Sequence, residues 1–232
     1  MQQWIEVAPG LRLTGGGAAW IPAQRTLVIA DVHVGYELAA QRRGGYLPLV
    51  ERGAAVGLRL RAMASEHAAL RVVIAGDLRH STRDLDEPER EELAGLAEAL
   101  GDAVALDVVL GNHDRGGAIV GRETAGTLRV GDVDVTHVPP IATPDRWTIC
   151  GHLHPRTTVR DETGAAARFP CALVGERLVV LPAFSDWAGG TAAGRLLDLL
   201  PDGEWRVLPV SGDAIVDLGI VIGGNREDRN DR

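Results

Sequence analysis

The stretches TLVIADVH (residues 26–33), RVVIAGD (71–77) and DVVLGNHD (107–114) share one pattern. Each is a short run of aliphatic residues that passes directly into Asp, Asn or His. Such runs are typical of strands that are buried on both faces of a parallel sheet. Apolar residues at helical spacing follow the first run over residues 47–66, and Pro88 opens a second helical segment after the second run. The first half of the chain therefore predicts a β-α-β-α-β unit.

The chain changes character after residue 120, where short strand-like segments are joined by turns that contain Gly, and no long helix is expected. These segments are TLRV (127–130), VDVTHV (133–138), WTICGH (147–152), TTVRD (157–161), ARFPCALVG (167–175), ERLVVLP (176–182), AGRLLDLL (193–200) and EWRVLPV (204–210). We expect them to pair as antiparallel strands, and residues 1–25 to add one or two edge strands. The sequence predicts one α/β (α+β) domain over residues 1–222 and a disordered, highly charged tail over 223–232.

Composition excludes several classes of protein. The 232 residues carry 24 basic and 32 acidic side chains, so the net charge of −8 does not indicate a generally nucleic-acid-binding or membrane-binding surface. No apolar run approaches the roughly 20 residues that span a bilayer, and the N-terminus lacks the pattern of a signal peptide. Cys150 and Cys171 show no CxxC spacing, which favours two buried free thiols. We expect a soluble cytoplasmic protein without membrane contact.

Five predicted strands end in residues that bind metals or move protons. Because ligands in open α/β sheets bind beyond the carboxyl ends of the strands, we expect these ends to converge on one crevice. Five of the seven histidines stand at these ends, whereas His67 fits a helix terminus, and His80 fits either the pocket or a surface turn. The candidate metal ligands are Asp31, His33, Asp77, Asn112, His137, His152 and His154.

The ligand set indicates the kind of metal and the kind of substrate. Asp31 and His33, like His152 and His154, are two positions apart, so in extended backbone each pair would project to one side. Nitrogen and oxygen ligands without thiolate favour Mn, with Fe or Zn as alternatives, and seven of them suffice for two divalent ions. Two ions and two carboxylates leave about +2 charges, which favours an anionic substrate. Taken singly, Asp-x-His or GHLH is commonly structural; five such clusters in order are far more specific.

With these motifs, the chain resembles the calcineurin-like metallophosphoesterases over residues 1 to about 220. More narrowly, ADVHVGYE (30–37), RRGGYLP (42–48), AGDLRH (75–80) and LPAFSDWAGG (181–190) are similar to the DNA-ligase-associated (Icc-like) metallophosphoesterases. The resemblance implies a four-layer α-β-β-α sandwich, two mixed sheets flanked by helices, with two metal ions at its edge. It also implies association with DNA-repair ligase or helicase proteins.

The resemblance carries roles over to particular positions. Asp31, His33 and His154 would hold one ion and Asp77 would bridge, while Asn112, His137 and His152 would complete the second site. His113 would be the catalytic histidine, oriented by Asp114. His137 departs from the pattern of many relatives, because Val138-Pro139-Pro140 follows it where those relatives have Gly.

We expect metal-assisted hydrolysis of a phosphate ester, in which His113 either protonates the leaving group or stabilises charge on the phosphoryl oxygens. The intervals between motifs leave no room for a lid domain, so an open crevice is expected, which is compatible with a phosphodiester in a nucleotide or nucleic-acid strand. The resemblance to the ligase-associated group implies a diester, such as single-stranded DNA, rather than a monoester. A phosphomonoesterase or protein phosphatase, and a non-catalytic scaffold, are the alternatives. His80, Arg79 and Arg115 are candidate substrate-binding residues.

Two further groups of side chains have open interpretations. The arginines next to the motifs form either a basic rim for a phosphate backbone or a solvated surface that pairs with Asp84, Asp86 and Glu87. They are Arg42, Arg43, Arg79, Arg83, Arg115 and Arg156. Phe184 and Trp187 could stack on a base, or pack locally.

Overall fold

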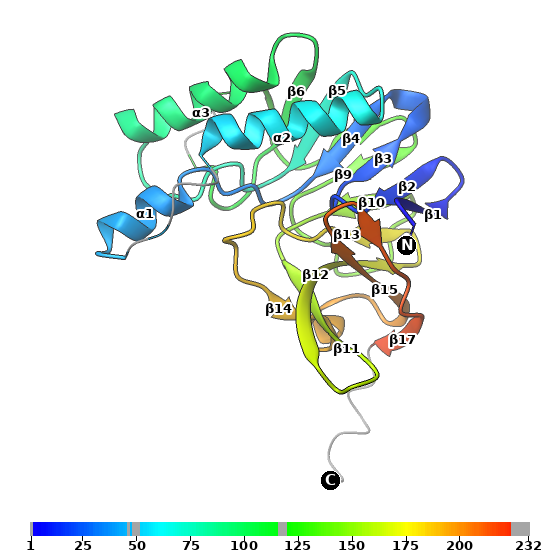
Figure 1. Cartoon of the computed structure of the whole chain (residues 1–232). Coiled ribbons are helices and arrows are strands. Elements are labelled where there is room, and N and C mark those ends of the chain that lie inside the picture. The colour runs from blue at the N-terminus through cyan, green and yellow to red at the C-terminus, as the bar shows by residue number, and fades with distance from the viewer. Residues whose placement is uncertain (1, 46, 48–51, 116–119, 224–232) are drawn as a thin grey trace.

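The computed structural model describes residues 2–45, 47, 52–115 and 120–223. Two mixed sheets stack face to face, helices α2 and α3 lie across the outer face of the first sheet, and a short helical segment covers the second (Figure 1). The predicted four-layer α-β-β-α sandwich is confirmed.

The first sheet contains the predicted β-α-β-α-β unit. Its strands run in chain order: β1 (Trp4–Ala8), β2 (Leu11–Thr14), β3 (Ala19–Ile21), β4 (Thr26–Ile29), β5 (Arg71–Ala75), β6 (Ala105–Val109) and β7 (Arg122–Thr124). Strands β4 to β7 are parallel, and β1 to β4 are antiparallel. Three strands precede β4 where one or two were expected, and β7 was not expected.

Helices connect the parallel strands of the first sheet. They are α1 (Tyr36–Arg42), α2 (Gly53–Glu66) and α3 (Glu87–Leu100), and a 3-10 turn, η1 (Pro22–Gln24), precedes β4. Helix α3 begins as expected for a segment opened by Pro88, and Asp86 caps it by accepting a hydrogen bond from the Glu89 amide. Helix α1 was missed; it is seven residues long and follows Gly35, whose φ of 87° lies in the left-handed region.

The second sheet is more parallel than the sequence suggested. Its strands are β8 (Leu128–Val130), β9 (Val133–Val135), β10 (Thr148–Cys150), β11 (Pro155–Arg160), β12 (Ala166–Gly175), β13 (Leu178–Val180), β14 (Thr191–Ala192), β15 (Gly203–Ser211), β16 (Ala214–Ile215) and β17 (Ile220–Gly223). Strand β12 is antiparallel to β11, β13 and β15, as expected. Strand β10, however, is parallel to both β9 and β13. All of β10 is buried, which is the signature of a strand inside a parallel ladder.

The segment AGRLLDLL (193–200) is helical, so its expected strand was wrong. It forms α4 (Ala193–Leu196) followed by the 3-10 turn η2 (Leu197–Leu199). Leu196, Leu197 and Leu200 are buried against the outer face of the second sheet. Their i, i+1, i+4 spacing places them on one side of a helical turn, which makes burial possible without strand pairing.

Three apolar cores hold the four layers together. One lies between the sheets, one between α2, α3 and the first sheet, and one between the second sheet and the α4–η2 segment. Cys150 and Cys171 are free and buried in the third core, as expected. Of the helices that the structure describes, none is long and apolar enough to cross a bilayer. Most of the predicted tail (223–232), Leu49 and part of the RRGGYLP stretch lie outside the described residues.

Helices α2 and α3 pack very closely, and glycine makes this possible. A Cβ at Gly57 would lie 2.3 Å from the backbone oxygen of Leu96 on α3. At Gly95, on α3, a Cβ would meet nothing nearer than 3.5 Å. The two positions therefore differ in packing space, although both are helical glycines.

We predict that Gly57→Ala lowers the free energy of unfolding by about 1–3 kcal/mol through overpacking, although Ala is the better helix former. Gly95→Ala is the matched control and should stabilise the protein by up to about 1 kcal/mol. Urea unfolding of both variants measures the difference. Equal stabilisation by both substitutions would show that the helices are not in this close contact.

Candidate metal centre

The carboxyl ends of five strands meet at one edge of the sandwich. Strands β4, β5 and β6 of the first sheet and β9 and β10 of the second end there, and each is followed within a few residues by a predicted ligand. Hydrogen bonds tie the ends together: the His33 amide donates to the Asp77 carbonyl at 2.9 Å, and the His152 amide donates to Asp31 Oδ2 at 2.8 Å. All seven predicted ligands therefore lie in one place, although 123 positions separate Asp31 from His154 (154 − 31).

Five of these seven residues have left-handed backbone. The φ angles are 55° at Asp31, 53° at His33, 51° at Asp77, 71° at His152 and 45° at His154. The extended backbone that we expected for the Asp31/His33 and His152/His154 pairs is therefore wrong. For residues other than Gly this region is uncommon, and such positions cluster at functional sites where the surrounding structure enforces them.

Two glycines leave room for the candidate ligands. A Cβ at Gly76 would lie 2.0 Å from His137 Nδ1, and one at Gly111 would lie 2.3 Å from Asp77 Oδ1. Gly76 also has a φ of 86°. Any larger side chain at either position would displace a candidate ligand.

Asp31, His33 and His154 form a first group of candidate ligands. Their ligand atoms lie within 4.8 Å of one another. His154 Nε2 is 3.5 Å from Asp31 Oδ2 and 3.4 Å from His33 Nε2, while His154 Nδ1 bonds to the Gly189 carbonyl. Asp31 is fully buried, and its Oδ1 has no hydrogen-bond partner among the described residues. A buried carboxylate oxygen without a partner is costly unless a cation compensates it.

Asp77, His137 and His152 form a second group, with Asn112 beside it. His137 Nδ1 donates to the Ala75 carbonyl at 3.1 Å, so Nε2 is the ring nitrogen that faces the other members of the group. Around that Nε2 lie Asn112 Oδ1 at 2.8 Å, His152 Nδ1 at 3.0 Å and Asp77 Oδ1 at 3.5 Å. The structure thus brings His137 into the group despite the Val-Pro-Pro sequence that follows it.

The pKa shifts are consistent with ligand behaviour. Burial, followed by the neighbouring imidazoles His154 and His113, lowers the pKa of His33 to about 3. Burial and His137 also lower the pKa of His152. Burial alone would lower the pKa of His154 too, but its contact with Asp31 outweighs this and raises it. His33 is therefore neutral near pH 7 with a lone pair available, and the position beside Asp31 favours positive charge.

Both groups fit a divalent cation on the chemistry of their donors. Each combines one carboxylate with two imidazoles, and bonds to backbone carbonyls orient His137 and His154, as is usual for metal-bound imidazoles. Mn, Fe and Zn accept such mixed nitrogen and oxygen ligands, whereas Ca and Mg prefer oxygen alone.

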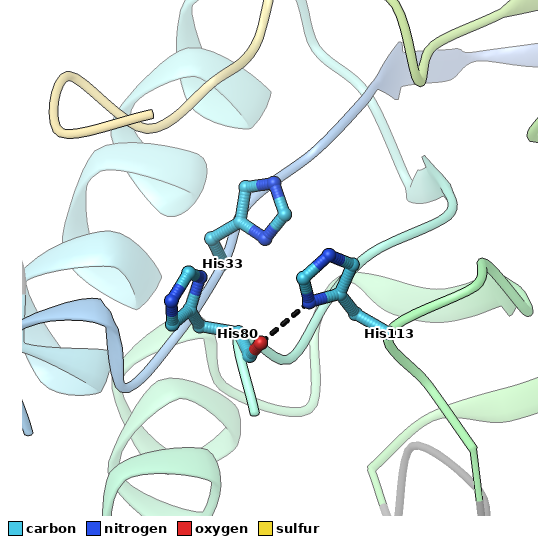
Figure 2. Close-up of side chains that lie close together, drawn as sticks. All are labelled: His33, His80 and His113. Carbon is cyan, nitrogen blue, oxygen red and sulfur yellow. Dashed lines mark hydrogen bonds between the residues drawn. The ribbon is translucent and has the colours of Figure 1, made fainter. Parts of the chain in front are cut away.

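A wall of three histidines lies next to the first group. Figure 2 shows His33, His80 and His113 facing one another, with ring centroids 5.0–5.6 Å apart. His80 therefore lines the site rather than a surface turn. The ring of Tyr36 packs on His80 at 4.4 Å between centroids, a contact that the sequence did not indicate. Burial, then the charges of His113 and Arg43, lowers the pKa of His80 to about 4. Because the wall contains no carboxylate, it matches a divalent cation less well than the two groups do.

Asp114 does not orient the ring of His113, contrary to our expectation. His113 Nδ1 bonds instead to the backbone carbonyl of His80 (Figure 2). The buried Asp114 carboxylate accepts three backbone amides, those of Arg79 and Gly111 at 2.9 Å each and Leu78 at 3.3 Å. It joins the loops that follow β5 and β6, and so it positions His113 through the backbone rather than through the ring.

Arg79, a predicted substrate-binding residue, is committed to contacts within the protein. It is 2% exposed, and its guanidinium donates to the carbonyls of Arg83 and Arg115 and pairs with Glu89 at 3.3 Å. The side chain of Arg115 is exposed, so the structure leaves it accessible as expected.

The two aromatic candidates pack locally. Phe184 is 3% exposed and lies beneath the guanidinium of Arg59, 3.7 Å from the ring centroid, which leaves it no face for a base. Trp187 is half-buried, and its ring N–H bonds to the buried carboxylate of Glu37 at 3.2 Å.

Comparison with known proteins supports the architecture. No protein-family model matches the sequence, and no curated protein matches it. A solved structure does match, described as the crystal structure of Pseudomonas putida nuclease MPE, with a TM-score of 0.69 and 22% sequence identity. The match covers 93% of this chain and 99% of that chain. The two chains share a fold.

The contacts of Asp114 generate a prediction. In Asp114→Asn, the new NH₂ group would face at least one of three backbone amide donors, so we expect the free energy of unfolding to fall by about 1–3 kcal/mol. Urea unfolding of the variant and the wild-type protein measures this difference in the free energy of unfolding. Unchanged stability together with a shifted pKa of the His113 imidazole, followed by NMR, would instead support the ring contact that the sequence predicted.

Proposed function

We propose that this protein is a dinuclear metal-dependent phosphodiesterase that cleaves the backbone of nucleotides or nucleic acids. One observation carries the proposal: two adjacent groups, each with one carboxylate and two imidazoles, stand beside a further histidine that neither group uses. The shared fold adds support, because the matching structure is described as that of a nuclease.

The proposed ligand assignment follows the two groups. Asp31, His33 and His154 would hold one ion, and Asn112, His137 and His152 would hold the other. Asp77, which is buried at the end of β5, would be shared by the two ions. Manganese is the favoured metal, with Fe or Zn as alternatives. When bound, the two ions lower the pKa of a shared water and offset the charge of the phosphoryl oxygens.

His113 is the proposed general acid. Its Nδ1 is held by the carbonyl of His80, so Nδ1 keeps its proton and Nε2 is the nitrogen available to the substrate. As an imidazolium, His113 would give its Nε2 proton to the oxygen that leaves phosphorus, and the electron pair of the breaking P–O bond would form the new O–H bond. A hydroxide derived from water would form the new P–O bond, and His113 would be left neutral with its proton on Nδ1. The ring of His80 stacks against that of His113, which supports the proposal that His80 contacts a phosphoryl oxygen.

The exposure of the ligands favours a diester. Asp31 and Asp77 are deeply buried, at 0% and 2% exposure, whereas Asn112 and His152 are exposed. The centre therefore opens at the protein surface along one side. An extended substrate that continues beyond the scissile phosphate can lie across such an opening, and two bound divalent cations would attract its negative charge.

The role of His113 can be separated from metal binding. We predict that His113→Ala retains the bound metal but loses about 10²–10⁴-fold in turnover, because it removes a proton donor and no ligand. His67→Ala is the control, since His67 ends α2 and packs on Trp20. Metal content by elemental analysis and turnover would be measured on the same samples. Loss of metal from His113→Ala would contradict the division of roles.

The proposed activity is tested with three substrates and the manganese-loaded protein. They are bis-p-nitrophenyl phosphate, p-nitrophenyl phosphate and a single-stranded DNA oligonucleotide. We expect hydrolysis of the small diester and of DNA, and little hydrolysis of the monoester. Preference for the monoester would indicate a phosphatase instead. Inactivity on all three would contradict the proposed function and favour a scaffold.

A further inference from the structure

Three exposed arginines lie close in the chain to α1, His80 and His113, beside the histidine wall. Arg43 directly follows α1, Arg83 lies three residues after His80, and Arg115 lies two residues after His113. Arg43 is close enough to His80 for its charge to be among the causes that lower the pKa of that imidazole. Every basic residue in the chain is arginine, so each of the three presents a planar guanidinium that can bind two phosphate oxygens at once.

The buried side chain of Arg79 fixes two of these arginines relative to each other. Its Nη2 donates to the carbonyl of Arg83 at 2.7 Å, and its Nη1 donates to the carbonyl of Arg115 at 3.2 Å. Glu89, which is 5% exposed, neutralises the Arg79 guanidinium. The loops that carry His80 and His113 are therefore joined at the points from which Arg83 and Arg115 project, and the contact is sheltered from solvent.

The neighbouring carboxylates are largely taken by other arginines. Asp86 and Glu89 pair with Arg42, and Glu87 lies 3.6 Å from Arg90. Among the described residues, no carboxylate pairs with the side chains of Arg43, Arg83 or Arg115. Asp84 and the buried Asp114, which accepts only backbone amides, are the carboxylates left nearby. Three arginines and two aspartates give a local charge of +1 (3 − 2) in a chain of net charge −8. Such a local excess of positive charge fits a polyanion better than a small neutral ligand.

We propose that Arg43, Arg83 and Arg115 form a phosphate-binding rim that holds the nucleic-acid backbone next to the scissile phosphate, on the His80–His113 side of the centre. The inference rests on the proposed function and specifies how the same site engages a polymer. A small diester reaches the centre but not the rim, whereas a strand contacts both. The rim therefore sets the preference for strands over small diesters.

The test is the triple variant Arg43→Gln/Arg83→Gln/Arg115→Gln. Arg160→Gln is the control. Strand β11 begins at Pro155, directly after the candidate ligand His154, and Arg160 is an exposed arginine at the opposite end of that strand. Binding of a fluorescent single-stranded oligonucleotide to metal-free protein is measured by anisotropy over a range of salt concentrations. Cleavage of DNA and of bis-p-nitrophenyl phosphate is measured with manganese, and circular dichroism checks that each variant is folded.

For the triple variant, we expect the slope of log K against log salt to fall by about 2, since each phosphate contact on a single strand contributes roughly 0.7. The ratio of DNA cleavage to small-diester hydrolysis should fall at least about tenfold, because the strand contacts the rim and the small diester does not. Arg160→Gln should change neither quantity. An unchanged salt slope, or an equal loss on both substrates, would overturn the rim. Inactivity of the wild-type protein on both substrates would instead overturn the proposed function, while the binding measurement would still decide on the rim.

Discussion

The candidate metal centre depends on backbone that the two sheets hold in an uncommon conformation. Asp31, His33, Asp77, His152 and His154 all have left-handed φ angles, each of which costs of order 1–3 kcal/mol for a residue other than Gly. Hydrogen bonds between neighbouring strand ends, such as that from the His33 amide to the Asp77 carbonyl, hold them there. The three cores stabilise the sheets, and the sheets in turn offset the local strain at the edge.

Bound cations would explain the arrangement of the polar groups at this edge of the sandwich. Asp31 is fully buried and its Oδ1 has no hydrogen-bond partner among the described residues, while His137 Nε2 lies near the oxygens of Asn112 and Asp77. Without positive charge, a buried carboxylate oxygen that lacks a partner is unfavourable. Two divalent ions would satisfy both groups, and the same charge would attract a phosphate. The strain and the unpartnered Asp31 oxygen therefore have one common explanation.

Much of this could be predicted from the sequence, because strand and ligand signals are local. Aliphatic runs that end in Asp, Asn or His identified β4, β5, β6, β9 and β10 and the seven residues that converge after them. One prediction failed because the contact is made by a backbone atom, which the identity of a residue does not reveal. The carbonyl of His80, which replaces Asp114 as the partner of the His113 ring, is a backbone atom that every residue has.

Other failures arise from tertiary packing. Arg79 lies beside the site in sequence and was expected to face the substrate, but the fold buries it against Glu89 and two carbonyls. The segment AGRLLDLL contains four leucines, and only packing against the second sheet decides that it is helical rather than a strand. Helix α1 is short and has little periodicity from which to predict it.

The central claim is that two cations occupy the edge where the strands of both sheets end. Anomalous X-ray scattering from crystals of manganese-loaded protein tests it most directly. We expect two peaks in each chain, one among Asp31, His33 and His154 and one among Asp77, His137 and His152. A single peak, or peaks away from both groups, would contradict it.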